Sequence, residues 1–409
     1  MANFFETNNF IDKVVLTEFE NNLHMAKTVN RQFQNTFSPQ SGTQVRIRKP
    51  TRYVPVSGQD LTAQVQDIQE RTVTLNIDTH QNVLVEVTSE QLALELDDFM
   101  REILNPAILQ LANKIDSDLY QSSLAFYNAV GTAGTAVNSL ATMNQARTLL
   151  TSQGVSLSPR SACLNPIDGG ALSTAQQQYF NYANFNEDVV DNGMVGRMAG
   201  FEIYEVQNTA ISLLSSASLG AGPYAVNGPV ANGATTVNVD GLTPGVTIYA
   251  GAIFTIAGVG AVNPITRNPT GFIKQFANYA DVVVDGLGNA ALTLNPEDAI
   301  VFNVIYLNSQ YNNVTALPVD GATVLFEASH SVNPAYCPEA FTLAMIKLPE
   351  FNNKGAYSRT FSDPKSGISF RVGEQASIVQ DKQFIRVDCL YGLRAFQEYG
   401  CRIMGSYTA

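Results

Sequence analysis

Histidines are the residues in this chain best suited to acid–base or metal chemistry at neutral pH. The three histidines, His24, His80 and His330, lie far apart and form neither an HxxxH nor an HExxH spacing. Zinc sites and catalytic bases need partners at a defined spacing and in a defined structural context. We therefore predict surface or packing roles for all three histidines and no metal site.

Acidic residues gather once, at Glu95, Asp97, Asp98 and Glu102. A carboxylate cluster of this kind can perform general acid–base catalysis or bind calcium. On an amphipathic helix it more often forms a solvated face, and acidic residues ahead of Asn105 also suit a helix N-terminus. The solvated face is the interpretation that we favour.

Glycine-rich stretches at residues 131–134, 193–196 and 258–260 could in principle hold phosphate. None of them carries the lysine of a GxxxxGK[ST] loop or the strand and helix that flank a GxGxxG loop. The chain also lacks the GxSxG elbow of the α/β-hydrolases. These stretches predict turns.

The four cysteines, Cys163, Cys337, Cys389 and Cys401, are widely separated and form no CxxC pair. This spacing argues against a zinc ribbon or a disulfide framework and predicts reduced thiols. The sequence therefore predicts no catalytic residue, no cofactor-binding residue, no metal ligand and no bound cofactor. We expect a protein that is not an enzyme.

The strongest charged pattern is a basic cluster followed by acidic residues: Arg46, Arg48, Lys49 and Arg52, then Asp60, Asp67, Glu70 and Asp78. Only Tyr53 places an aromatic ring beside the basic cluster, so a nucleic-acid interpretation is weak. Opposite charges on one element suit complementary contacts between copies of the chain. Pairing within the element is equally open. The candidate inter-subunit contacts are Arg46, Arg48, Lys49, Arg52, Asp60, Asp67 and Glu70.

The composition of the 409-residue chain suggests that much of its surface becomes buried. It is 45% hydrophobic but only 15% charged, against roughly 25% charge in an average soluble domain. Interface centres are depleted in charge, although an ordinary β-rich protein would also fit. The net charge of −12 argues against a reader of nucleic acid. The start of the chain lacks a signal-peptide pattern and no apolar run reaches 18 residues, so we expect cytoplasmic synthesis and no membrane.

Apolar periodicity predicts several helices. Residues 12–35 carry one apolar stripe, which fits either a core helix or an N-terminal arm on a neighbouring subunit. Thr88 and Gln91 have capping-box spacing and predict a short helix. Asn105 and Pro106 then predict the start of a long helix that runs toward Phe126.

Two further helices are predicted closer to the C-terminus. One occupies residues 139–152, with Gly154 at the left-handed position that commonly follows a helix. The other covers Pro338 to Leu348, where Phe341, Ala344 and Leu348 share one side.

Alternating apolar residues predict half-buried strands between residues 44 and 88, with Val45 and Val87 near the two ends. The polar stretch from Ser57 to Arg71 interrupts them, which indicates a long two-stranded excursion with a mobile tip. Isolated hairpins are marginally stable in water. We therefore expect a neighbouring chain to hold this excursion.

The segment from Tyr224 to about His330 is rich in Gly, Asn, Val and Thr and is divided by turn dipeptides such as Asn227-Gly228. It predicts an all-β domain inserted into a larger domain. Strand alternation returns at Ile368, Phe370 and Val372.

The order of these elements resembles the major capsid proteins of tailed bacteriophages, which have the Hong Kong 97-type fold. Three local phrases are also similar to that family. Residues 192–203 look like its Gly-x-(Ile/Val)-Gly-x-x-x-Gly-Phe-x-(Val/Ile) stretch, residues 241–259 look like a segment of an inserted β-domain, and residues 386–392 look like its closing strand. Within the family, the chain resembles the coat proteins of short-tailed phages that carry such an insertion.

The resemblance implies an α+β fold with the following parts: an N-arm at 1–36, an extended loop at 37–88, a peripheral domain with a spine helix at 89–137, an axial and peripheral body at 138–223, the inserted β-domain at 224–330, and a return to the body at 331–409. It implies hexamers and pentamers that build an icosahedral head around double-stranded DNA. The implied partners are copies of the chain, a scaffolding protein, a portal, a decoration protein as a further candidate, and packaged DNA bound without sequence specificity. Assembly would take place in the host cytoplasm.

Some relatives crosslink their subunits through a lysine in the loop. Here Lys49 is the only lysine between Lys27 and Lys114, and it lies near the base of the loop. We therefore predict non-covalent contacts. The alternatives are a β-rich tail or adhesion protein, an encapsulating shell of the same fold, and an enzyme with an unfamiliar site.

Overall fold

The computed structural model describes residues 25–34, 37, 42–55, 57–58, 65–66, 68, 70–88, 105–176, 196–302, 310–351, 356–362, 369–377, 379 and 381–407. The chain is a strand-rich α+β protein. It divides into two units: the first is Met1–Arg46, Thr74–Tyr120 and Phe341–Arg394, and the second is Ile47–Val73, Gln121–Ala340 and Ala395–Ala409. Each unit thus combines segments that are far apart in the sequence.

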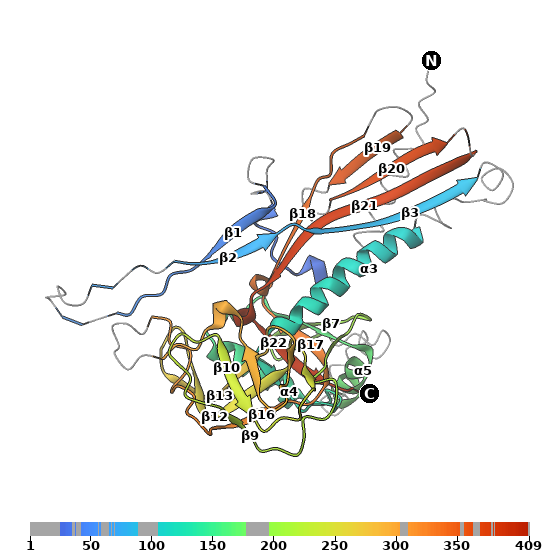
Figure 1. The fold of residues 1–409 in the computed structure, drawn as a ribbon. Coiled ribbons are helices and arrows are strands. Elements are labelled where there is room, and N and C mark those ends of the chain that lie inside the picture. The colour runs from blue at the N-terminus through green and yellow to red at the C-terminus, as the bar shows by residue number, and fades with distance from the viewer. Residues whose placement is uncertain are drawn as a thin grey trace, which may run out of the picture. The chain divides into compact units, whose positions relative to one another are not determined.

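The first unit is built on a five-stranded sheet of long strands (Figure 1). Its strands are β3 (Thr79–Thr88), β18 (Phe341–Ile346), β19 (Ala356–Ser362), β20 (Ser369–Ser377) and β21 (Lys382–Ala395). The order is β18-β21-β20-β19, with β3 also paired to β21. Helix α3 runs beside this sheet, and Tyr391 on β21 donates a hydrogen bond to Asp118 on the helix.

Helix α3 (Asn105–Ser122) confirms the long helix predicted from the apolar stripe. Pro106 occupies its first turn, where a missing N–H costs nothing. The stripe is fully buried, at Ile108, Leu111, Ala112, Ile115 and Leu119. Burial of each large aliphatic side chain stabilises the unit by about 1.5 to 3 kcal/mol, so packing of this face accounts for the helix.

The helix predicted for residues 12–35 is wrong over its described part. Residues 25–34 contain the 3-10 turn η1 (Met25–Lys27) and a parallel bridge from Asn30 to Thr342. The buried carboxylate of Asp116 accepts hydrogen bonds from the backbone N–H groups of Met25 and Ala26, each at 3.1 Å. The carboxylate of Asp116 therefore provides these N–H groups with the hydrogen-bond acceptors that helix carbonyls would otherwise provide. The rest of that helix, and the short helix predicted after Thr88, lie outside the described residues.

The excursion begins as predicted, because β1 (Gln44–Lys49) pairs with β2 (Arg71–Asn76). Their inward residues, including Val45 and Val73, are buried. Strand β3, which the alternation placed in the same excursion, pairs instead with β21, with Val85 opposite Ile385. Alternation indicates that one face of a strand is buried, but it does not identify the partner strand.

The second unit contains a seven-stranded sheet of order β4-β22-β17-β5-β7-β6, with β8 paired to β17. These strands are β4 (Ala129–Val130), β5 (Ser161–Leu164), β6 (Arg197–Met198), β7 (Phe201–Glu205), β8 (Ala210–Ser212), β17 (His330–Tyr336) and β22 (Gly400–Gly405). Side chains of α4 and of strands β5, β7 and β22, such as Met143, Phe201 and Ile403, form one core.

Helix α4 (Leu140–Ser152) confirms the prediction for residues 139–152. Ser139 caps its start, since its Oγ accepts a hydrogen bond from the N–H of Ala141 at 3.0 Å. Gly154 follows it at φ +77°, as the sequence indicated. Helix α5 (Pro166–Gln176) was not predicted.

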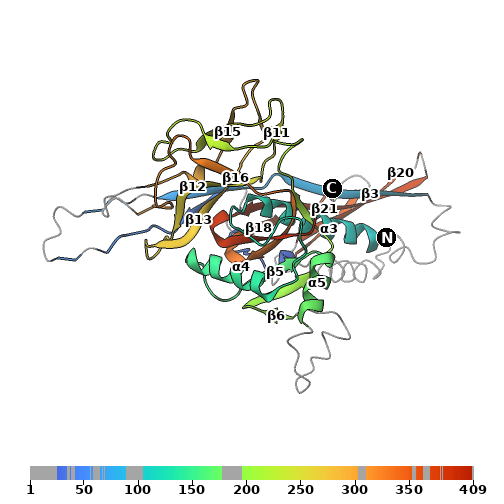
Figure 2. The ribbon, with the colours of Figure 1, turned by 90° about the horizontal axis from the view of Figure 1, so that it is seen from below.

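Within the second unit, the described strands between Tyr224 and Phe326 form a six-stranded sheet of order β13-β12-β16-β9-β10-β15, together with a two-stranded sheet of β11 and β14. The strands are β9 (Tyr224–Val226), β10 (Thr236–Asp240), β11 (Thr247–Ile248), β12 (Ile253–Val262), β13 (Pro269–Ala277), β14 (Val282–Val283), β15 (Ala290–Thr293) and β16 (Thr323–Phe326). Figure 2 shows β12, β13 and β16 side by side. Val237, Phe254 and Phe276 belong to a core of buried residues that come, apart from Leu219, from this segment.

The helix predicted for residues 338–348 is wrong. The chain makes a 3-10 turn, η8 (Pro338–Ala340), and then continues as strand β18. The first five residues of β18, from Phe341 to Met345, are all buried. A strand buried on both faces satisfies a helical apolar spacing as well, and short apolar runs do not separate the two. The predicted strand around Phe370 and Val372 is confirmed by β20.

Candidate inter-subunit contact site

The structure describes five of the seven candidate contact residues and separates these five into three groups. Arg46 is exposed on β1. Arg48 and Glu70 pair with each other at 3.4 Å, with side chains 74% and 52% exposed. Asp60 and Asp67 lie outside the described residues. The other two, Lys49 and Arg52, form ion pairs within the second unit.

Lys49 and Arg52 converge on one carboxylate, that of Glu398. The Lys49 Nζ lies 3.0 Å from Glu398 Oε1, and the Arg52 Nη2 lies 2.9 Å from Glu398 Oε2. Each carboxylate oxygen therefore binds a cation from the outgoing arm of the excursion, which is the stretch that leaves β1. The same Nζ of Lys49 also lies 3.0 Å from Glu297 Oε2 and 5.7 Å from the centre of the Phe396 ring.

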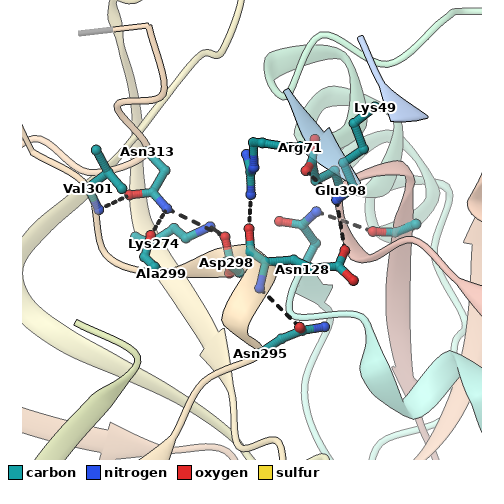
Figure 3. A network of polar contacts seen from close by, with 12 residues as sticks. Lys49, Arg71, Asn128, Lys274, Asn295, Asp298, Ala299, Val301, Asn313 and Glu398 are labelled. Atoms are coloured by element: carbon teal, nitrogen blue, oxygen red, sulfur yellow. Dashed lines mark hydrogen bonds and ion pairs between the residues drawn. The ribbon is translucent and has the colours of Figure 1, made fainter. Parts of the chain in front are cut away.

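The returning arm of the excursion reaches the same place through Arg71. Its guanidinium donates a hydrogen bond to the backbone carbonyl of Glu297 and lies over the ring of Tyr311, 5.3 Å from its centre. Figure 3 shows Lys49, Arg71 and Glu398 gathered around the residues that follow Asn295. Both arms are thus bound at their base.

The acidic partner from the β-rich segment is positioned by a tight turn. The turn η6 (Pro296–Asp298) starts with proline, and the side chain of Asn295 accepts a hydrogen bond from the N–H of Glu297 at 3.1 Å. This cap fixes the backbone from which Glu297 and Asp298 extend. Glu398 comes from a second turn, η9 (Gln397–Tyr399), between β21 and β22.

Asp298 binds a different cation, Lys274 of β13. The Lys274 Nζ is 3.6 Å from Asp298 Oδ1 and 3.6 Å from the centre of the Tyr127 ring, and its side chain is only 4% exposed. Asn313 donates a hydrogen bond to Ala299 O at 2.8 Å, accepts one from Val301 N at 2.9 Å, and lies 3.5 Å from Asp298 (Figure 3). A buried lysine thus has both a carboxylate and an aromatic face.

The environment shifts the pKa values of Glu398 and Asp298 in opposite directions. Burial by itself raises the pKa of Glu398, but the charges of Lys49 and Arg52 outweigh it and hold that pKa below its ordinary value. For Asp298 burial prevails over the attraction of Lys274, so its pKa is raised. Burial also raises the pKa of the Tyr127 hydroxyl. The network therefore favours an ionised Glu398 and opposes ionisation of Asp298.

The network borders a cavity of about 250 Å³. Its charged lining residues are three cations and three acids: Arg52, Arg71, Lys274, Glu297, Asp298 and Glu398. The described residues contain no group of three or more His, Cys, Asp and Glu side chains that could hold a metal ion.

The other residues singled out in the sequence do not join this site. His330 is buried on β17, while His80 lies on β3 and its Nε2 is 3.6 Å from Asp388. All four cysteines are buried and unbridged. His24 and the acidic cluster around Asp97 lie outside the described residues. Within the described part of the chain, no helix has the length and hydropathy needed to cross a membrane.

Sequence reasoning found the basic half of the network and missed its acidic half. Glu297 and Glu398 are about 250 and 350 positions from Lys49 in the numbering, so no local spacing connects them. One signal was present: adjacent acids at Glu297 and Asp298, next to a proline, stand out in a segment dominated by Gly, Asn, Val and Thr.

Comparisons with known proteins address the identity of the chain. Similar solved structures include one described as "Mycobacterium phage Che8", with 12% identity, coverage of 94% of this chain and 92% of that chain, and a TM-score of 0.47. Another is described as "Capsid of Ralstonia phage GP4", with 9% identity, coverage of 96% and 91%, and a TM-score of 0.47. A third, "The head structure of Helicobacter pylori bacteriophage KHP40", has 13% identity, coverage of 90% and 87%, and a TM-score of 0.45. No curated protein matches the chain.

The decisive comparison is with protein families. The family described as P22 coat protein, gene protein 5, matches residues 1–405, which is nearly the whole chain. This match shows that the protein is a structural major capsid protein of a tailed bacteriophage. The chain belongs to the P22 coat protein family.

Proposed function

We propose that this capsid protein adopts the Hong Kong 97-type fold and assembles as hexamers and pentamers into an icosahedral head around double-stranded DNA. The observation that carries the proposal is the part of the excursion that belongs to the second unit, residues 47–73. Its described residues Val65 and Ile68 are 83% and 70% exposed, and Tyr53 is 55% exposed. Large apolar side chains left exposed on one segment favour an interaction surface. Copies of the same chain are the partners that a coat protein meets.

The division into parts follows the same proposal. Residues 1–36 serve as the N-arm, 37–88 as the extended loop, 89–137 as the peripheral domain with the spine helix α3, and 138–223 with 331–409 as the body. Residues 224–330 serve as the inserted β-domain, and the six-stranded sheet with its own core supports this assignment.

The candidate contacts are best divided by their exposure. Arg46 is exposed and, together with Asp60 and Asp67, remains a proposed contact with neighbouring subunits. The exposed pair of Arg48 and Glu70 can exchange partners at little cost, because ion pairs at the surface contribute about 0 to 1 kcal/mol. Lys49 and Arg52 serve the chain's own structure first, as their ion pairs indicate.

The proposed partners are a scaffolding protein, a portal, a decoration protein and the packaged DNA. The net charge of −12 suits an inner wall that does not adhere to DNA. Assembly in the host cytoplasm, the absence of catalysis and non-covalent contacts between subunits belong to the same proposal.

Electron microscopy tests it. The purified chain, alone and with its scaffolding protein, should give capsomers, tubes or closed shells, whereas a stable monomer under both conditions would contradict the proposal. Deletion of the tip, residues 57–64, should leave the fold intact and abolish shells. The double substitution Val65→Asp and Ile68→Asp should also abolish shells. The matched control, Val65→Thr and Ile68→Thr, keeps the branching at Cβ and the β-propensity. Because a hydroxyl costs less to bury than a carboxylate, this variant should retain some assembly.

A further inference from the structure

The base of the excursion is held by charges that come from two other parts of the second unit. Lys49 and Arg52 on the outgoing arm and Arg71 on the returning arm contact Glu297, from the β-rich segment, and Glu398, from the turn before the last strand. Three segments that are remote in sequence therefore meet at two glutamates.

These ion pairs are shielded from water, unlike the pair beside them. The side chains of Lys49 and Glu398 are 9% and 21% exposed, whereas those of Arg48 and Glu70 are 74% and 52% exposed. Shielding lowers the local dielectric constant and strengthens each charged hydrogen bond, and it makes the loss of one partner costly because the other charge stays buried. The Lys49 cluster therefore restrains the excursion far more than the Arg48 pair does.

Two further contacts of the excursion's outer part each involve at least one uncharged partner. Arg267 donates to the carbonyl of Tyr53 at 3.2 Å, and Gln310 donates to the side chain of Gln66 at 3.4 Å. Val65 and Ile68 are exposed. The shielded charges at the base are stronger polar attachments than either of these two contacts.

We propose that Glu297 and Glu398 form an ionic latch that docks the base of the excursion on the second unit, and that loss of the latch releases residues 47–73 while the rest of the unit stays folded. The latch fixes the direction in which the excursion extends from the second unit. A role of the latch in assembly rests on the proposed function, because the excursion is the segment proposed to contact neighbouring subunits. The latch itself is a property of the single chain.

Hydrogen exchange on the full chain, measured by mass spectrometry under conditions in which it is unassembled, tests the latch. The substitution Glu398→Gln keeps the shape of the side chain and removes its charge. It should raise exchange in peptides covering residues 47–55 and 70–73 by roughly 10- to 100-fold, the range expected when charge-assisted hydrogen bonds are lost. Peptides from the six-stranded sheet should change little.

The matched control is Glu70→Gln, which removes the exposed pair on the same excursion and should leave exchange within about twofold of the wild type. A double-mutant cycle on Arg52→Gln and Glu398→Gln should show coupling well above that of Arg48→Gln and Glu70→Gln. The latch is overturned if Glu398→Gln leaves the excursion unchanged, or if it raises exchange uniformly throughout the second unit.

Failure of the latch is distinguishable from failure of the proposed function. Wild-type chain that forms no shells with scaffolding protein contradicts the function, whatever the exchange data show. Wild-type shells together with unchanged exchange in Glu398→Gln contradict the latch alone.

Discussion

His330 should make the stability of this coat protein depend on pH between pH 7 and pH 5. It lies on β17 and is 1% exposed. Its Nδ1 lies 2.7 Å from the carbonyl oxygen of Ala328, to which it donates as Nδ1–H, and its Nε2 has no hydrogen-bond partner among the described residues. Burial lowers the pKa of His330 to about 4, with a contribution from the charge of Arg402, against the opposing effect of the bond to Ala328.

The sign and size of the effect follow from linkage. In the unfolded chain the imidazole has a pKa of 6.5, so it binds a proton as the pH falls below that value, while the folded chain keeps it neutral down to about pH 4. The contribution of His330 to stability is therefore complete above pH 6.5 and is lost as the pH falls toward 4. At 1.36 kcal/mol for each pKa unit, the loss between pH 7.5 and pH 5 is about 2 kcal/mol.

The substitution His330→Asn isolates this effect. Its amide nitrogen can replace Nδ1 as the donor to Ala328, and it does not titrate. Urea unfolding of both proteins at pH 7.5, 6 and 5 gives the difference in free energy of unfolding at each pH. Other titrating groups are common to both proteins and cancel. The wild type should lose about 2 kcal/mol relative to the variant over this range, and a difference that stays constant with pH would refute the reasoning.

Three further predictions follow from other contacts. Gly400→Ala should destabilise the second unit by about 1 to 3 kcal/mol, because a Cβ there would lie 2.3 Å from the Phe126 ring; unchanged urea unfolding would contradict this. Glu398→Gln should lower the free energy of unfolding by about 1.5 to 3 kcal/mol at pH 7 and by less at pH 3.5. The reason is that the lowered pKa of Glu398 makes its contribution complete above pH 4.5 and lost as the pH falls through its folded pKa. Mature particles should run as single chains on a denaturing gel, since Lys49 is engaged with Glu297 and Glu398; a ladder of multimers would contradict this.

The helices show what local sequence can determine in this fold. α3 and α4 were predictable because each carries its own start signal and an apolar stripe long enough to exclude a strand. The segment from Phe341 to Ile346 lacked that length, and its burial on both faces satisfied a helical spacing equally well. Asp116 shows a different limit, because the backbone of Met25 is organised by a carboxylate some 90 positions away.

The charge network shows the same limit for the site. The basic cluster was visible because Lys49 and Arg52 are neighbours in the sequence, and the expectation of contacts between copies was one of two open interpretations. The structure adds that three of the seven candidates, Arg48, Lys49 and Arg52, pair with acids of their own chain. Ion pairs between distant segments depend on how the sheets and turns fold, and no periodicity reports them.

Charged residues are scarce in this chain, so their concentration at the base of the excursion indicates a structural role there. Only 15% of the residues are charged, yet three cations and three acids line one cavity at the base of the excursion. Apolar packing alone would let an extended segment slide along the body, because dispersion contacts have little directionality. Charged hydrogen bonds from Lys49, Arg52 and Arg71 define one position for it. The cost of desolvating these groups offsets much of their attraction, so the docked state is specific in direction while remaining open to release.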